Sequence, residues 1–184
     1  MSYLPPIEKP RNPVLRAMFA VARKMFGVVP GPFSVFCARM PLAFLSFFGK
    51  VNRLDSKLTL PKDLQALVRE RTASLNMCTW CMDAQRWFAQ KKAPAWLPKM
   101  DALDHYATSE LFSAAERAAL DYATALTRDK RVPRELFEAL SVHFTERQIC
   151  ELAWLVSSEH LYNINNIGLG IESDRMCELK PRAA

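Results

Sequence analysis

The sequence predicts an all-α protein of about seven to eight helices, and three observations support this fold class. Only five of the 184 residues are glycine, which favours helices over turn-rich structure. Apolar residues recur at helical spacing along most of the chain, and no segment alternates with period two for long enough to form a strand. Because no linker or internal repeat divides the chain, we expect one domain over residues 1–184.

Residues 1–26 are expected to form an N-terminal arm followed by an amphipathic helix. Prolines fill the arm, and basic residues between Arg11 and Lys24 surround apolar ones. A helix with this pattern docks on another helix or subunit, or lies on a membrane surface. The apolar stretch from Pro41 to Val51 is too short to cross a membrane, so no membrane span is expected.

The middle of the chain has the pattern of two consecutive helices. Pro61 opens a segment of helical period that runs to Asn76, and the same period resumes just after the cysteines. Prolines at positions 94 and 98 then leave only a short turn of helix before residue 103. Cys78 and Cys81 therefore lie where one helix ends and the next begins.

Two capping boxes mark the start of later helices. Ser113 and Glu116 have the spacing at which a serine oxygen accepts a first-turn N–H and a glutamate reaches back to the cap residue. Thr145 and Gln148 repeat this arrangement. Pro133 fits the first turn of a helix between them, because its missing N–H would be unpaired there.

The last predicted helix is the most apolar and runs from Ile149 to about Asn163. We expect Asn163, Asn165 and Asn166 to satisfy backbone groups at its end rather than to bind a substrate. The chain that follows is expected to be a tail, with residues 172–184 outside the helical core.

Charge and cysteine content bear on the compartment. The formal charge of +6 comes from scattered Lys and Arg without a nucleic-acid motif, which predicts a solvated basic surface and no nucleic-acid partner. The N-terminus lacks the order of a secretory signal, so a cytoplasmic protein is expected. Thiols are held reduced in the cytoplasm, and a close cysteine pair there is catalytic or metal-binding rather than part of a structural disulfide framework.

The motif Cys78-Thr79-Trp80-Cys81 is open to three interpretations. At the start of a helix, unpaired N–H groups and the helix dipole favour a thiolate, and a second thiol one turn away can condense with an oxidised sulfur to close a disulfide. Alternatively, the two cysteines only fill small apolar space. A zinc site would need four ligands, whereas the three histidines are dispersed, so no metal or cofactor is expected.

The chain resembles the carboxymuconolactone decarboxylase and alkylhydroperoxidase D (AhpD) family from Gly27 to about Ile171. The run LPKDLQALVRERTASLNMCTWC is similar to the family's helix that leads into the CxxC motif, and the stretch from Phe112 to Ser173 is similar to its second half. The resemblance implies an AhpD-like all-α fold and homo-oligomers. For members with the cysteine pair, it implies reduction of peroxides by a dithiol that an external thiol reductant regenerates.

Two positions depart from the family's peroxidase motif. That motif has a glutamate twelve residues before the first cysteine and a histidine four after the second, and the two form a proton relay with the sulfurs. This sequence has Ala66 and Gln85 there, and neither can shuttle a proton at neutral pH. Glu70, one turn after Ala66 on the same face, is a candidate replacement, with a solvated surface charge as the alternative.

Other polar residues have open interpretations. His160 is the best-placed histidine to act as a base, with a core or interface histidine as the alternative. Asp83 is about 200° around the helix from Cys81, so no contact with that sulfur is expected. Cys177 is either an additional resolving thiol or an inert tail cysteine, and Cys37 and Cys150 are interpreted as packing residues.

The leading hypothesis is a thiol peroxidase in which Cys81 attacks the peroxide and Cys78 resolves the product, with Glu70 and His160 as accessory catalytic candidates. One alternative is a decarboxylase that acts on a small lactone acid, although no cationic cluster is evident beyond Arg69 and Arg71. A second alternative is a non-catalytic oligomer with a redox-sensing CxxC. The aromatic-rich segment from Phe33 to Phe48 is the predicted oligomer contact.

Overall fold

The computed structural model describes residues 2–178, and in this range the chain is all-helical, as predicted. The α-helices are α1 (Pro13–Phe26), α2 (Pro41–Asp55), α3 (Lys62–Leu75), α4 (Thr79–Lys92), α5 (Leu97–Asp101), α6 (Ala114–Asp129), α7 (Arg134–Ser141) and α8 (Glu146–Gly168). A π-helical segment (Phe33–Cys37) precedes α2, and short 3-10 segments (Pro94–Trp96 and Leu103–His105) flank α5. No helix of the described chain is long and apolar enough to cross a membrane.

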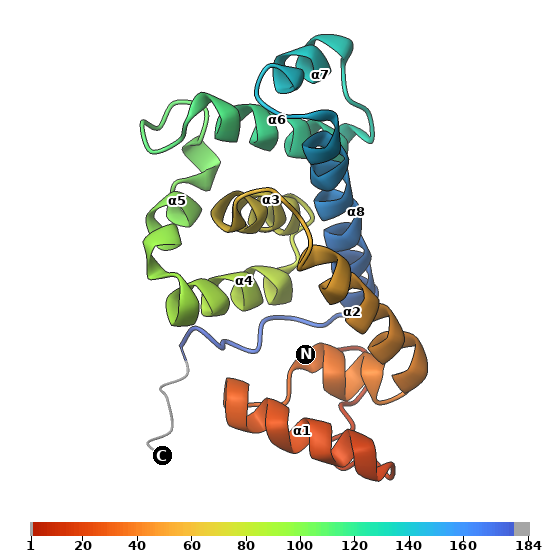
Figure 1. Ribbon diagram of the computed structural model, residues 1–184. Helices are drawn as coiled ribbons and strands as arrows, with labels where there is room; N and C mark the ends of the chain where they lie inside the picture. The colour runs from red at the N-terminus through yellow and green to blue at the C-terminus, as the bar shows by residue number, and fades with distance from the viewer. Residues whose placement is uncertain (1, 179–184) are drawn as a thin grey trace.

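Helix α3 is the centre of the fold. Figure 1 shows it surrounded by α4, α5, α6 and α8, with α1 and α2 at one end of the molecule. Leu64 and Val68 of α3 pack against α6 and α8, whereas Ala66 and Leu67 lie in a second apolar cluster with α4, α5 and α6. Nine of its fourteen residues are buried, so α3 is held from all sides.

The two predicted capping boxes are confirmed. Ser113 and Glu116 form the capping box of α6, and Thr145 and Gln148 that of α8. Asn12 caps α1 by accepting from the backbone N–H groups of residues 14 and 15. The predicted end of the last helix is wrong, because α8 continues past Asn163 to Gly168.

The segment after α8 is more than a loose tail. Residues 171–178, which we call the C-terminal strap, run between α4 and α1 (Figure 1). Ile171 and Met176 of the strap are buried. The remaining residues of the predicted tail, 179–184, lie outside the described part of the chain.

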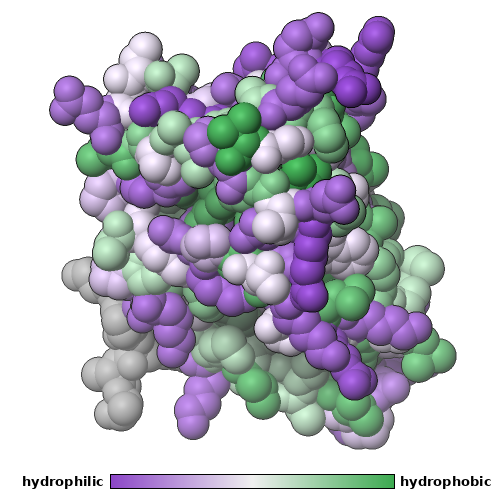
Figure 2. All heavy atoms as spheres, turned by 45° about the horizontal axis from the view of Figure 1, so that its top comes forward, coloured by the Kyte–Doolittle hydropathy of each residue, from purple (hydrophilic) through white to green (hydrophobic). Residues whose placement is uncertain are grey.

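The exposed surface differs between regions of the molecule. Figure 2 shows a face on which hydrophilic side chains are interspersed with apolar ones. By contrast, α2 exposes Leu42, Phe47 and Phe48, and the C-terminal half of α8 exposes Ile164 and Ile167. The predicted contact segment is therefore only partly exposed, because Phe44 within it is buried against neighbouring phenylalanines.

Candidate functional site

The corner between α3 and α4 places the two cysteines. Cys78 N–H bonds to the carbonyl of Ala73 and Met77 N–H to that of Ser74, the two bonds that close a Schellman motif at the end of α3. This turn forces Met77 into the left-handed region, with φ 57°. Cys78 then serves as the N-cap residue of α4, and Cys81 lies in the first turn of that helix. The predicted helix boundary at the motif is confirmed.

The two cysteines are joined by a disulfide. Their Cα atoms are 5.3 Å apart, and both side chains are almost fully buried, with 1% of Cys78 and 3% of Cys81 exposed. Ala73 packs against both of them. The pair can therefore form a bond at small cost in backbone adjustment, as the one-turn spacing predicts.

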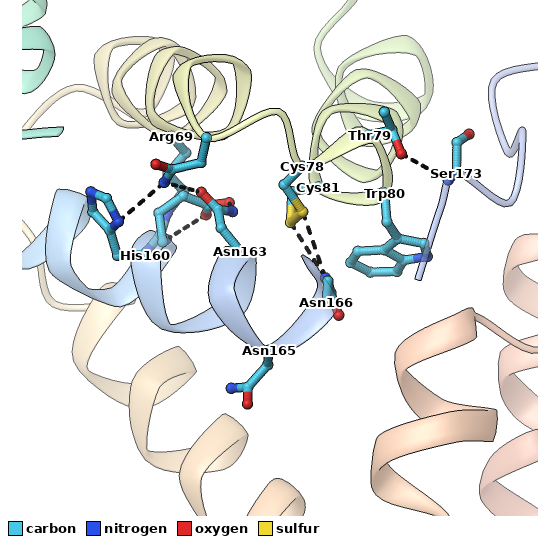
Figure 3. Close-up of a disulfide and its surroundings, with 12 residues drawn as sticks. Arg69, Cys78, Thr79, Trp80, Cys81, His160, Asn163, Asn165, Asn166 and Ser173 are labelled. Carbon is cyan, nitrogen blue, oxygen red and sulfur yellow. Dashed lines mark hydrogen bonds and ion pairs between the residues drawn. A yellow bond between two sulfur atoms is a disulfide. The ribbon is translucent and has the colours of Figure 1, made fainter. Parts of the chain in front are cut away.

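Asn166 is the polar side chain that contacts the sulfurs. Its Nδ2 lies 3.4 Å from Cys81 Sγ and 3.8 Å from Cys78 Sγ, and the residue is buried on the last turns of α8 (Figure 3). An amide donor at this distance favours a thiolate over a thiol. The expectation that Asn166 only satisfies backbone is wrong.

A buried polar chain extends along α8 from the cysteine corner. Asn76 Nδ2 donates to Asn163 Oδ1 at 2.8 Å, and Asn163 Nδ2 donates to Glu159 Oε1 at 2.8 Å. Glu159 Oε2 accepts from Arg69 at 3.2 Å, and Arg69 also pairs with Asp55 at 2.6 Å. Asn163 is therefore a core residue that links α3 to α8, and its expected role at a helix end is wrong.

Sequence reasoning missed this asparagine face of α8, although a signal for it exists. Glu159, Asn163 and Asn166 are spaced i, i+4 and i+7, so they share one face of the helix. The same face carries two fully buried leucines: Leu155, one turn before Glu159, and Leu152, two turns before it. Polar side chains that continue a buried apolar face need partners, and that requirement distinguishes them from residues at a helix end.

His160 is separated from the sulfurs by this chain. Its Nδ1 lies 3.1 Å from Asn76 Nδ2, and its Nε2 is buried without a hydrogen-bond partner among residues 2–178. Burial lowers the pKa of the imidazole. Figure 3 shows the ring on the side of Asn163 away from the disulfide. The structure therefore connects this predicted base to the corner at Asn76, without a bond to either cysteine.

Glu70 is buried between α3 and α4. Its Oε1 accepts from Arg86 Nε at 3.0 Å, and its Oε2 is buried and has no hydrogen-bond partner in the described part of the chain. Burial raises the pKa of this carboxyl group to about 7, and the attraction of Arg86 offsets only part of that effect. The alternative of a solvated surface charge is wrong, since 3% of the residue is exposed.

The two altered relay positions differ in burial. Ala66 is buried in an apolar cluster that includes Ala89 of α4. Gln85 is partly buried on α4, one turn beyond Cys81. A carboxylate at position 66 would enter an apolar environment, so the relay's first position has become part of the core.

Asp83 and Asp174 bind the C-terminal strap to α4. Asp83 accepts from the backbone N–H groups of Met176 (2.8 Å) and Cys177 (3.1 Å). Asp174 accepts from Trp80 Nε1 at 2.7 Å and from the N–H of Gly31 at the same distance. Asp83 thus anchors the strap, and in the described part of the chain it makes no hydrogen bond to Cys81 Sγ, as expected.

The remaining cysteines differ in their surroundings. Cys37 is fully buried and Cys150 is exposed, so the packing interpretation is right for the first and wrong for the second. Cys177 Sγ donates to the carbonyl oxygen of Asp83 at 3.4 Å. Burial and Asp83 raise the pKa of the Cys177 thiol to about 12, which keeps this thiol protonated at neutral pH.

A cavity of about 450 Å³, which we call the aromatic cavity, is lined by Trp80 and Asn166 from the surroundings of the disulfide, but by neither cysteine. Its walls come from the π-helical segment, α2, α4, α8 and the strap, and they include Phe44, Phe48, Trp80, Tyr162 and Met176. Asn166 belongs to both the cavity wall and the sulfur contact. No charged side chain is among the described residues that line it.

The two arginines considered as anchors for an acidic substrate both have other partners. Arg69 pairs with Asp55 and Glu159, and Arg71 bonds to Thr124 and Asp104. Both guanidinium groups are thus committed within the fold. Within residues 2–178, no group of three or more His, Cys, Asp or Glu could hold a metal ion.

Comparisons with known proteins place this fold. No protein-family model matches the chain. The uncharacterized protein YnjA of Escherichia coli is 28% identical over 178 residues, which covers 96% of each chain. Among solved structures, an uncharacterized peroxidase-related protein from Ralstonia eutropha with an AhpD core is 22% identical, with a TM-score of 0.77 over 99% of this chain and 97% of that one.

A second solved structure is the debrominase Bmp8. It is 21% identical, with a TM-score of 0.77, and the match covers 94% of this chain and 92% of Bmp8. These similarities show that the chain has the AhpD-like fold, which confirms the fold implied by the sequence resemblance.

Proposed function

We propose that this protein of AhpD-like fold is a thiol-dependent peroxidase, or a closely related dithiol oxidoreductase, whose electrons come from Cys78 and Cys81. One observation carries the proposal: the two sulfurs form a buried disulfide at the start of α4, with the Asn166 amide directed at both. A helix N-terminus and an amide donor both favour the thiolate that such chemistry requires.

The reaction assigns one role to each cysteine. The Cys81 thiolate attacks the terminal oxygen of a peroxide, the O–O bond breaks, and the alkoxide takes a proton to leave as an alcohol. Cys81 is then a sulfenic acid. The Cys78 thiol attacks that sulfur, a disulfide forms and water leaves. Two equivalents of an external thiol reduce the disulfide and leave as their own disulfide. We assign attack to Cys81 because its sulfur is the closer one to Asn166.

Proton transfer is the weak step in this site. Ala66 and Gln85 cannot act as a relay, and neither Glu70 nor His160 bonds to a sulfur in the disulfide state. Glu70 is the better of the two candidates, because its pKa of about 7 suits proton exchange at neutral pH. We therefore expect slow turnover, with the proton carried through water.

The test is steady-state consumption of cumene hydroperoxide with dithiothreitol as reductant. Wild type should turn over, and Cys81→Ser and Cys78→Ser should lose turnover. Cys150→Ser, which changes an exposed cysteine, should match wild type. Full activity in Cys81→Ser would exclude the assigned mechanism. No turnover by wild type, together with a disulfide that still forms and reduces, would favour the redox-sensing alternative.

A second candidate is reductive dehalogenation of a small aromatic compound. The observation that favours it is the aromatic cavity, whose wall includes the sulfur-contacting Asn166, in a fold shared with the debrominase Bmp8. The dithiol would supply two electrons: an aryl bromide and two thiols give the arene, a disulfide and hydrogen bromide. Release of bromide from an aryl bromide, lost in Cys81→Ser, would distinguish this reaction from peroxide reduction.

The lactone decarboxylase alternative is disfavoured, since both nearby arginines, Arg69 and Arg71, are committed to other partners.

We further propose a cytoplasmic homo-oligomer whose contact includes the exposed side chains Leu42, Phe47 and Phe48 of α2. Analytical ultracentrifugation at micromolar concentration tests the assembly, and a monomer would contradict it.

A further inference from the structure

We infer that the aromatic cavity binds an uncharged, flat aromatic molecule with its polar end at Asn166, the side chain that contacts both sulfurs. The inference rests on the proposed function for the reaction at the sulfurs. The class of ligand comes from the cavity alone. Three features of the cavity carry it: its ring-lined walls, its lack of charge, and the position of its polar atoms.

The walls favour an aromatic ligand. Phe44 and Phe48 are stacked, with ring centroids 5.7 Å apart and an interplanar angle of 10°, and Tyr162 packs edge-on against Phe48. Trp80 contributes to the cavity wall from α4. A further ring can extend such stacked and edge contacts, which are stronger than burial of the same area alone. The volume of about 450 Å³ falls in the usual range for small-molecule pockets and suits a one- or two-ring compound.

The absence of charge selects against acids and cations. None of the described lining residues is Lys, Arg, His, Asp or Glu. A carboxylate moved from water into this site would lose its hydration without gaining a partner, and that loss is large in an apolar environment. The site therefore rejects the charged relatives of a ligand whose neutral form it binds.

The polar atoms give the ligand a direction. Asn165 and Asn166 bring side-chain amides to a lining that is otherwise mostly apolar, and Asn166 is the residue that touches the sulfurs. A ligand whose one polar group meets Asn166 contacts the same side chain that donates to Cys81 Sγ. Met176 adds a wall from the C-terminal strap, which Asp83 fixes to α4.

The test uses ligands that cannot react, so that binding is measured apart from turnover. Calorimetry with wild type would compare 2-phenyl-2-propanol, the alcohol product of cumene hydroperoxide, with its para-carboxylated derivative and with 2-cyclohexyl-2-propanol. We expect the phenyl compound to bind at least about tenfold more tightly than the carboxylated one, and severalfold more tightly than the cyclohexyl one. Equal or tighter binding of either comparison compound overturns the inference.

Variants locate the binding in the cavity. Ala84→Leu on α4 and Ala43→Leu on α2 each add bulk to the cavity wall, and each should weaken binding of 2-phenyl-2-propanol at least about tenfold. Ala139→Leu makes the same change on the exposed surface of α7 and should leave binding as in wild type. Circular dichroism checks that each variant is folded. Because the two cavity variants lie on different helices, the test can still be made with one of them if the other does not fold. Unchanged binding in both folded cavity variants overturns the location.

The two proposals fail separately. Selective binding of the neutral aromatic alcohol, without reduction of peroxides or release of bromide, would contradict the proposed function and still support the ligand class. Turnover of peroxides without selectivity for the neutral aromatic ligand would remove the ligand class alone.

Discussion

Replacement of Glu70 by Gln should change how the stability of the protein depends on pH. Glu70 is 3% exposed, and its ion pair is with Arg86. Its Oε2 has no hydrogen-bond partner among the residues that the structure describes. Burial raises the pKa of this group from 4.5 to about 7. Glutamine has the same shape and keeps an oxygen for Arg86, but it does not titrate.

The size of the effect follows from these two pKa values. As the pH rises from 4.5 to 7, the unfolded chain releases the Glu70 proton while the folded chain keeps it. The folded state then binds more protons than the unfolded state, so stability falls with rising pH over this window and levels off above it. Each pKa unit corresponds to about 1.36 kcal/mol, which gives a loss of roughly 3 kcal/mol in wild type.

Urea unfolding at pH 4.5 and pH 8 measures this effect. The stability of Glu70→Gln relative to wild type should improve by up to about 3 kcal/mol between the two pH values. Contributions from other titrating groups cancel in the difference. Glu138→Gln, which alters an exposed surface pair on α7, is the control and should show no such change. An equal difference between Glu70→Gln and wild type at both pH values would refute a buried carboxyl with a raised pKa.

Three other substitutions test the site. Met77→Gly should raise the free energy of unfolding by about 0.5–1 kcal/mol, because Met77 is 80% exposed and held at φ 57°, a conformation that glycine adopts without strain. A lower free energy of unfolding in urea would contradict this expectation. Asn166→Ala should slow alkylation of reduced Cys81 by iodoacetamide at least about tenfold, because the amide donor to its sulfur is lost. Asn165→Ala is the control, since the Asn165 amide donates to the Leu161 carbonyl, and it should alkylate at the wild-type rate. Equal rates in the two variants would exclude a role for the Asn166 amide. Gln85→His should raise the peroxidase rate, with up to about 10²-fold expected when Ala66→Glu restores the full relay. No gain in a folded double variant would mean that the site serves another reaction.

The helices and the position of the cysteine pair could be predicted from sequence because their signals are local. Capping boxes at Ser113 and Thr145 and the apolar period set the helix starts, and two cysteines one turn apart at such a start must lie close together. The resemblance to AhpD proteins added the fold, which the solved structures confirm.

The parts of the site that depend on contacts between distant segments could not be read in this way. Glu70 was ambiguous because its burial depends on Arg86 of the next helix, and Asn166 meets the sulfurs only after α8 has packed against α4. Cys150 follows buried Ile149 in an apolar helix, yet it points outward because α8 is amphipathic there. The C-terminal strap is held by hydrogen bonds, from its Met176 N–H to Asp83 and from the Gly31 N–H to its Asp174. Such bonds leave no periodic pattern in the sequence.

In the proposed reaction, Cys78 and Cys81 supply the two electrons that reduce the peroxide. A single-turnover experiment tests it most directly: reduced protein is mixed with less than one equivalent of cumene hydroperoxide, free thiols are blocked, and the protein is digested for mass spectrometry. We expect one Cys78–Cys81 disulfide for each alcohol molecule formed, with Cys37, Cys150 and Cys177 still alkylated. Alcohol formed while both Cys78 and Cys81 remain alkylated would contradict it.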